Sequence, residues 1–157
     1  MKFYDKATLF LATGFGISLI CPFAPGTFGS APGVALAYAL ACIPWQFQII
    51  ASVALTLAAM PVCTCAEQLL SLRDDGRISA DEWMLFPISV IGIPLMSLPW
   101  WAMIIFFAVT RIIDIIKPPP AYALQRLKAG LGVVADDFAA NIYALLINWA
   151  IYLTFFK

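Results

Sequence analysis

The sequence contains no histidine, which excludes a Ser-His-Asp triad, histidine acid–base catalysis and a histidine-ligated zinc site within this chain. Charge is also scarce: nine Lys/Arg and nine Asp/Glu among 157 residues make up 11% of the chain and cancel to zero net charge. An average soluble domain is about 25% charged. Without a basic excess the chain has no surface for a phosphate backbone, so a nucleic-acid-binding protein is excluded as well.

Cysteine is rare, and each of the four cysteines stands in an apolar stretch: Cys21, Cys42, Cys63 and Cys65. A disulfide framework would place its cysteines in polar loops of a secreted chain. Cys63 and Cys65 would point about 200° apart on a helix, which is a poor arrangement for one metal ion. We interpret all four as small residues that face the core or lipid.

Apolar residues are abundant, at 63% of the chain, and the mean hydropathy is +0.93. The length suits one domain, 1–157. Three uncharged runs are long enough for helical membrane crossings, and proline divides two of them because it cannot continue a helix. The sequence therefore predicts an all-α, small polytopic membrane protein with short, Pro-broken helices over 31–43, 46–66, 82–97, 99–116 and 138–156.

Paired crossings would return the segments 21–30, 67–82 and 117–137 to one side of the membrane. Six of the nine basic residues lie near the last two of these segments, so the positive-inside rule predicts that this side is cytoplasmic. The segment 7–24 leads into a Gly/Pro-rich stretch without a cleavage site, so we expect a re-entrant or interfacial helix there and no cleavable signal.

Asp114 stands between Arg111 and Lys117 at spacings of three, which places all three on one face of a helix. A charge at mid-bilayer costs roughly 2.5–3.5 kcal/mol on insertion scales. One interpretation is an ion pair near the membrane surface with snorkelling cations. The other is a carboxylate metal ligand between two phosphate-binding cations, and the spacing alone does not decide between them.

Two further acidic pairs are predicted at helix starts. Ser79 and Glu82 match a capping box, but this leaves Asp81 and the preceding Asp74 unexplained. Asp136 and Asp137 are expected to open the final helix, where the dipole favours carboxylates. Because adjacent carboxylates repel each other, they favour a bound cation, and hard oxygen ligands suit Mg²⁺.

The segment 25–30, PGTFGS, carries the hydroxyls of Thr27 and Ser30 directly before a predicted helix. It is either a plain interhelical loop or an anion site made of free amides and hydroxyls, and it is no Walker A loop because G-K-[ST] is missing. Acidic residues, cations and this segment on one membrane face together indicate metal-assisted chemistry on a phosphate.

Five motifs in order over roughly 14–141 resemble the phosphatidylglycerophosphatase A family: GFG at 14–16, PGTFGS at 25–30, ISADEW at 78–83, RIIDIIKPPP at 111–120 and GLGVVADD at 130–137. The resemblance implies a Mg²⁺-dependent phosphatase of the bacterial inner (cytoplasmic) membrane, multi-pass, with its active site on the cytoplasmic side. Its substrate in the bilayer would be a phospholipid, phosphatidylglycerophosphate, and its products phosphatidylglycerol and phosphate.

The resemblance also assigns residues by position. The expected metal ligands are Asp74, Asp81, Glu82, Asp114, Asp136 and Asp137, and all except Asp74 are also expected to be catalytic. Thr27, Arg111 and Lys117 match the family's polar positions, and with Ser30 they are the expected phosphate-binding residues. The sequence departs from the family at Trp83-Met84-Leu85, Lys128-Ala129, Pro119 and Ala140-Asn141, which leaves the choice of substrate in doubt.

Two other functions stay open on the sequence alone. One is a non-catalytic small membrane carrier or assembly factor with the same fold. The other is a phosphatase for a different phospholipid or a prenyl phosphate. The sequence also leaves open whether water or an aspartate attacks the phosphate, and it does not indicate an oligomeric state.

Overall fold

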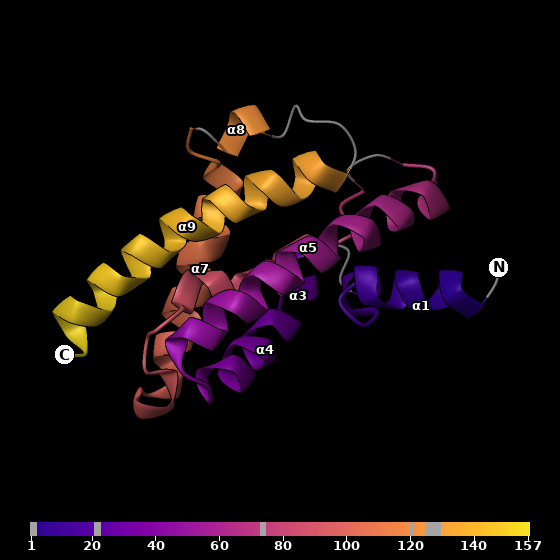
Figure 1. The fold of residues 1–157 in the computed structure, drawn as a ribbon. Helices are drawn as coiled ribbons and strands as arrows, with labels where there is room; N and C mark the ends of the chain where they lie inside the picture. The colour runs from indigo at the N-terminus through magenta and orange to yellow at the C-terminus, as the bar shows by residue number, and fades with distance from the viewer. Residues whose placement is uncertain (1–2, 21–22, 73–74, 120, 125–129) are drawn as a thin grey trace.

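The computed structural model describes residues 3–20, 23–72, 75–119, 121–124 and 130–157, and every regular element in these ranges is a helix (Figure 1). The all-α prediction is therefore confirmed. The elements are α1 (Phe3–Ala12), α2 (Ile17–Ile20), α3 (Pro25–Gly29), α4 (Pro32–Ala41), α5 (Trp45–Leu70), α6 (Ala80–Leu85), the 3₁₀ turns η1 (Phe86–Val90) and η2 (Leu95–Ser97), α7 (Trp100–Ile116), α8 (Ala121–Leu124) and α9 (Gly130–Phe155).

The two longest helices, α5 and α9, have 26 residues each and pack against each other (Figure 1). Trp45–Leu70 and Val134–Phe155 are each long and apolar enough to cross a membrane. The final helix was predicted over 138–156, but it begins at Gly130. No proline follows residue 120, so nothing in the backbone delays its start. The expectation that Asp136 and Asp137 open this helix is therefore wrong, since they lie in its second turn.

The helix predicted over 82–97 is also wrong. α6 ends at Leu85, and the chain continues through η1 and η2. Pro87 and Pro94 withhold the amides that a continuous α-helix needs, and Gly92 has a φ of +76°. All five residues of η1 are buried, so this first irregular turn lies inside the protein.

Polar side chains from the two long helices satisfy the backbone of this irregular segment. Gln48 of α5 accepts from the Gly92 amide through Oε1 at 2.9 Å. From α9, Asn148 donates through Nδ2 to the Ser89 carbonyl at 3.0 Å, and Trp149 donates through Nε1 to Ile91 at 2.9 Å. Buried irregular backbone needs such partners because an unpaired N–H or C=O group away from water costs free energy.

Small buried residues on α5 allow α6 to pack closely against it. Ala59, Cys63 and Ala66 are fully buried and share a core cluster with Trp83 and Leu85 of α6. Small residues at helix contacts favour close packing in membrane proteins. Among the described cysteines, Cys63 is buried while Cys42 and Cys65 are exposed, and all three are free, as expected. Cys21 lies outside the described residues.

The amino-terminal part differs from the prediction in one respect: the segment 25–30 contains a short helix, α3, instead of a loop. α4 follows directly, with Pro32 in its first turn, close to the prediction of 31–43. A Cβ atom at Gly29 would lie 2.0 Å from Oγ of Ser18 and 2.3 Å from Oγ of Ser79. α3 therefore packs directly on α2 and on the start of α6.

Candidate active site

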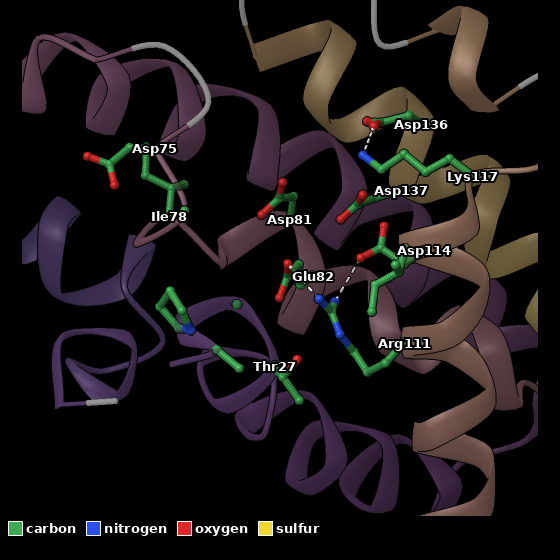
Figure 2. A pocket seen from close by; sticks show the side chains of 15 residues that line it. Thr27, Asp75, Ile78, Asp81, Glu82, Arg111, Asp114, Lys117, Asp136 and Asp137 are labelled. Atoms are coloured by element: carbon green, nitrogen blue, oxygen red, sulfur yellow. Dashed lines mark hydrogen bonds and ion pairs between the residues drawn. The ribbon is translucent and has the colours of Figure 1, made fainter. Parts of the chain in front are cut away.

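A polar cavity of about 340 Å³ lies where α3, α6, α7 and α9 meet the segment 75–78 (Figure 2). Six carboxylates and two cations line it. The sequence predicted both cations and every carboxylate except Asp75, together with Thr27, and the structure brings them to one place: Asp81, Glu82, Asp114, Asp136, Asp137, Arg111 and Lys117. Asp74, a predicted metal ligand, lies outside the described residues.

Asp81 and Glu82 enter the cavity because α6 begins directly before them, with Ser79 at the N-cap position. Ser79 makes no capping bond with its side chain; its hydroxyl shares a 2.9 Å hydrogen bond with Oγ of Ser18. The predicted capping box is therefore wrong. Glu82 is directed to Arg111, whose Nη2 donates to Oε1 at 3.0 Å.

Arg111 holds two carboxylates at once. Its Nη2 pairs with Glu82, and its Nη1 pairs with Oδ2 of Asp114 one turn along α7 at 3.0 Å (Figure 2). The three side chains are largely buried, with 11–15% of each exposed. The ion pair expected from the spacing of Arg111 and Asp114 is therefore present, and a third group from α6 joins it. The guanidinium suits this role because it has five donors in a fixed fork.

Lys117 follows the last residue of α7 with a φ of +47°, directly before Pro118. Its ammonium group donates to Oδ2 of Asp136 on α9. Burial opposes the charged form of Lys117, but this hydrogen bond and the surrounding carboxylates outweigh burial and raise its pKa above the usual value. Lys117 therefore remains a cation at the edge of the cavity.

Several polar atoms of the cavity are buried and lack any hydrogen-bond partner. They are Oδ1 of Asp81, Oε2 of Glu82, Oδ1 of Asp114, Oδ1 of Asp136 and Nε of Arg111. Leaving a buried charged group unsatisfied is costly, so such atoms normally have a ligand. Apart from Asp75, which pairs with Arg77, five carboxylates face two cations, and this excess of negative charge suits a bound cation.

The donor set fits Mg²⁺, which prefers hard anionic oxygens. Among the described residues no three carboxylates are close enough to form a closed metal cage as they stand. Mg²⁺ does not require such a cage, since it usually keeps several waters and binds through one or two carboxylates and substrate phosphate oxygens. An open group of carboxylates around a cavity of about 340 Å³, which has room for waters and a phosphate, therefore suits this ion.

Thr27 lines the cavity from α3, next to Gly26. A Cβ atom at Gly26 would lie 2.7 Å from Oε1 of Glu82, so a glycine lets the α3 backbone approach the carboxylate. Ser30 is buried, and its hydroxyl lies 2.9 Å from the carbonyl oxygens of both Gly26 and Thr27, either of which it can donate to. It is not among the described residues that line the cavity, so its contact with the phosphate stays a prediction.

The sequence analysis missed Asp75, which also lines the cavity. Its Oδ1 accepts from Nε of Arg77 at 2.9 Å, and these hydrogen bonds lower the pKa of the Asp75 carboxyl. Both oxygens of Asp75 thus accept from Arg77, whereas four of the other carboxylates each keep one oxygen without a partner. The Asp74-Asp75-Gly76 turn was the available signal, but the resemblance selected its first aspartate.

Comparison with known proteins agrees with the site. The sequence profile of the phosphatidylglycerophosphatase A family matches residues 10–152. A protein of Haemophilus influenzae named "Phosphatidylglycerophosphatase A" is 36% identical over 143 residues, which cover 90% of this chain and 86% of the relative. The protein of the same name from Escherichia coli is 29% identical over 133 residues, covering 84% and 76%.

A third relative carries a different name. The "Putative phosphatidylinositol-3-phosphatase" of Bacteroides thetaiotaomicron is 32% identical over 152 residues, which cover 94% of each chain. No solved structure shows significant similarity. The family match covers most of the chain and includes every described carboxylate of the cavity, so this chain belongs to the phosphatidylglycerophosphatase A family of phosphoric monoester hydrolases.

Proposed function

We propose that this protein removes the terminal phosphate of phosphatidylglycerophosphate and leaves phosphatidylglycerol in the bilayer. One observation carries the proposal: buried carboxylates with unpartnered oxygens face Arg111 and Lys117 across a single cavity. A phosphate monoester needs both kinds of group, cations for its own charge and anions to hold a metal ion. The names of two relatives supply the substrate.

Mg²⁺ is the proposed cofactor, held by carboxylates from Asp81, Glu82, Asp114, Asp136 and Asp137. Asp74 is proposed as a further ligand on the resemblance alone. When bound, the ion would polarise a phosphoryl oxygen and lower the pKa of a coordinated water. The orphaned oxygens on four of these side chains support this assignment, because they have no partner within the described protein.

Arg111 and Lys117 are proposed to bind the phosphate, with the Thr27 hydroxyl as an additional donor. Lys117 is the more accessible cation, with 24% of its side chain exposed, and a phosphate oxygen can share its ammonium group with Asp136. Arg111 still has an unused Nε donor. In the proposed reaction a water oxygen attacks phosphorus and a carboxylate of the cluster accepts the water's proton. The ester P–O bond breaks, and the leaving glycerol oxygen takes up a proton to give the lipid alcohol.

The cavity is proposed to face the cytoplasm, in a multi-pass protein of the bacterial inner membrane. The carboxyl end of α5, the amino-terminal part of α9 and the segment 75–78 lie at the same end of the bundle (Figure 1). Three described basic residues lie at that end, Arg77, Arg111 and Lys117, and the positive-inside rule favours a cytoplasmic side for them.

A second candidate substrate is a different lipid phosphate. The relative from Bacteroides thetaiotaomicron aligns with 94% of this chain, and its printed name refers to a phosphoinositide. The chemistry of the cavity is the same for any phosphate monoester at the end of a lipid headgroup. The assay must therefore compare headgroups.

The test is phosphate release by the purified protein in detergent micelles from phosphatidylglycerophosphate, phosphatidylinositol 3-phosphate, phosphatidic acid and a prenyl phosphate. We expect phosphatidylglycerophosphate to be hydrolysed in Mg²⁺ and release to stop in EDTA. The Asp136→Asn/Asp137→Asn variant should be inactive at normal yield. Full activity in metal-free buffer would refute the Mg²⁺ proposal. Faster phosphate release from another lipid would refute phosphatidylglycerophosphate as the proposed substrate. If a covalent phosphoprotein is trapped during turnover, the nucleophile is an aspartate and not water.

A further inference from the structure

Outside the polar cavity, an apolar groove of about 350 Å³ runs between α4 and α7. One wall comes from the α4 side and the other from four residues of α7. The lining residues are Ala31, Val34 and Tyr38 on one side and Trp100, Met103, Ile104 and Phe107 on the other. No charged side chain of the described chain lines it.

The groove leads to the polar cavity along both of its walls. Its α7 residues are spaced by three and four, so they lie on one face of the helix. The next residue on that face after Phe107 is Arg111, which lines the polar cavity. On the opposite wall, Ala31 follows four residues after Thr27, which also lines the cavity. The polar cavity and the apolar groove therefore adjoin along the same two parts of the chain, α7 and the α3–α4 segment.

The dimensions match one leaflet of a bilayer. Arg111 lies eleven positions after Trp100, which corresponds to about 16 Å at the 1.5 Å rise of a helix. The hydrocarbon core of a bilayer is about 30 Å thick, so one leaflet provides about half of that depth. The outer parts of the groove are open: Trp100 is 74% exposed and Ile104 is 57% exposed.

We propose that this groove, which we call the α4–α7 groove, holds an acyl chain of the lipid whose phosphate occupies the polar cavity. The proposal rests on the proposed function, since it needs a lipid phosphate as substrate. An acyl chain extends from the headgroup into its own leaflet, which is the course of the groove from Arg111 toward Trp100. An apolar, uncharged lining next to a few polar groups is typical of a ligand site.

A second apolar groove lies between α5 and α9, but it does not share both walls with the cavity. It is lined by Ile49, Ser52, Val53, Ile88, Ile91, Phe138, Ile142 and Leu145. In the described chain no residue of α5 lines the polar cavity. On α9, Phe138 points about 100° away from the adjacent Asp137. This groove is therefore the matched control.

The first experiment compares acyl-chain lengths. KM is measured, as a mole fraction in micelles, for two forms of phosphatidylglycerophosphate. One form carries two oleoyl chains and the other carries two hexanoyl chains. Ile104→Trp fills the α4–α7 groove, and Val53→Trp fills the control groove at a residue of similar exposure, 49%. We expect Ile104→Trp to raise the KM for the oleoyl lipid about tenfold or more and to leave the hexanoyl KM unchanged. Val53→Trp should change neither value.

The outcomes separate the two proposals. If the wild type releases no phosphate from either lipid, the proposed substrate is wrong. If the wild type is active but Ile104→Trp leaves the ratio of the two KM values unchanged, or Val53→Trp changes it equally, the acyl-chain proposal is overturned.

The second experiment needs no turnover. Phosphatidylglycerophosphate with a diazirine in one acyl chain is photolysed with the protein in micelles, and the labelled peptides are identified. We expect labels within 31–38 and 100–107 that Ile104→Trp reduces and Val53→Trp does not. Labels confined to α5 and α9, or labels that both variants reduce equally, would overturn the proposal.

Discussion

Arg111 on α7 donates to Glu82 on α6 at 3.0 Å, and this contact joins two segments that are 29 residues apart in the chain. The same guanidinium holds Asp114, so the side chains of two helices take their positions from one group. All three are largely buried. Removing one member of a buried ion pair typically costs about 3–5 kcal/mol because the other charge is left uncompensated. The geometry of the cavity therefore depends on Arg111.

The first prediction concerns the shape of this cation. Arg111→Lys keeps the positive charge, but an ammonium group cannot pair with Glu82 and Asp114 in the same fork. We expect kcat to fall by about tenfold or more and the melting temperature to drop, measured by phosphate release and by thermal unfolding in detergent.

Arg77→Lys is the matched control, because Arg77 also pairs with an aspartate but its side chain is 45% exposed. Ion pairs with an exposed partner contribute little to stability. This variant should stay within about twofold of the wild type in kcat. Equal effects of the two substitutions would show that the fork of Arg111 has no special role.

The second prediction concerns Lys117. Lys117→Ala removes the cation at the cavity edge and should lower kcat by about 10²-fold, the typical loss for one contact to developing charge in a transition state. Lys117→Arg retains the charge and should recover part of the activity. Near-normal turnover of Lys117→Ala, in protein that is inserted normally, would mean that Lys117 only anchors α7 and pairs with Asp136.

Much of the site could be predicted from the sequence because charge is rare in this chain. A carboxylate in an apolar segment is costly and therefore indicates a functional role, so the sequence singles out Asp81, Asp114 and Asp137. Their spacing could not reveal which groups meet. The Glu82–Arg111 contact joins residues far apart in the chain, and local patterns carry no information about it.

The errors in the fold have identifiable causes as well. Apolar content alone predicted a helix over 82–97, although Pro87 and Pro94 prevent one; the buried turns persist because Gln48, Asn148 and Trp149 satisfy their backbone. The capping box failed because Ser18, distant in sequence, bonds the Ser79 hydroxyl. The first error thus has a local cause, the two prolines, whereas in the second a tertiary partner overrode a local preference.

The third prediction tests metal binding without turnover. Mg²⁺ at about 100 times its Kd should stabilise the folded protein by about 2.7 kcal/mol. For a chain of this size that corresponds to a rise of several degrees in melting temperature, at about 2–4 °C per kcal/mol. Asp137→Asn should abolish most of this rise. In EDTA the variant should melt at or above the wild-type temperature, because one of the crowded like charges is gone.

The control for this prediction is Asp75→Asn, which removes a carboxylate that lines the same cavity but already pairs with Arg77. It should keep the response to Mg²⁺. A wild-type protein that melts at the same temperature in Mg²⁺ and in EDTA would contradict the assignment of these carboxylates to a metal ion.

The last prediction concerns the packing that holds Thr27 and Glu82 at the same cavity. A methyl group at Gly29 would overlap Oγ of Ser18 and Oγ of Ser79, at 2.0 and 2.3 Å. Gly29→Ala must therefore push α3 away from the start of α6, at a cost of about 1–3 kcal/mol for overpacking. We expect a lower melting temperature together with a lower kcat, because Asp81 and Glu82 follow Ser79 directly. Gly76→Ala is the control for stability, since its new Cβ would have only Cγ of Pro25 nearby, at 3.9 Å. If Gly29→Ala melts like the wild type, the contact of α3 with α6 does not position the site.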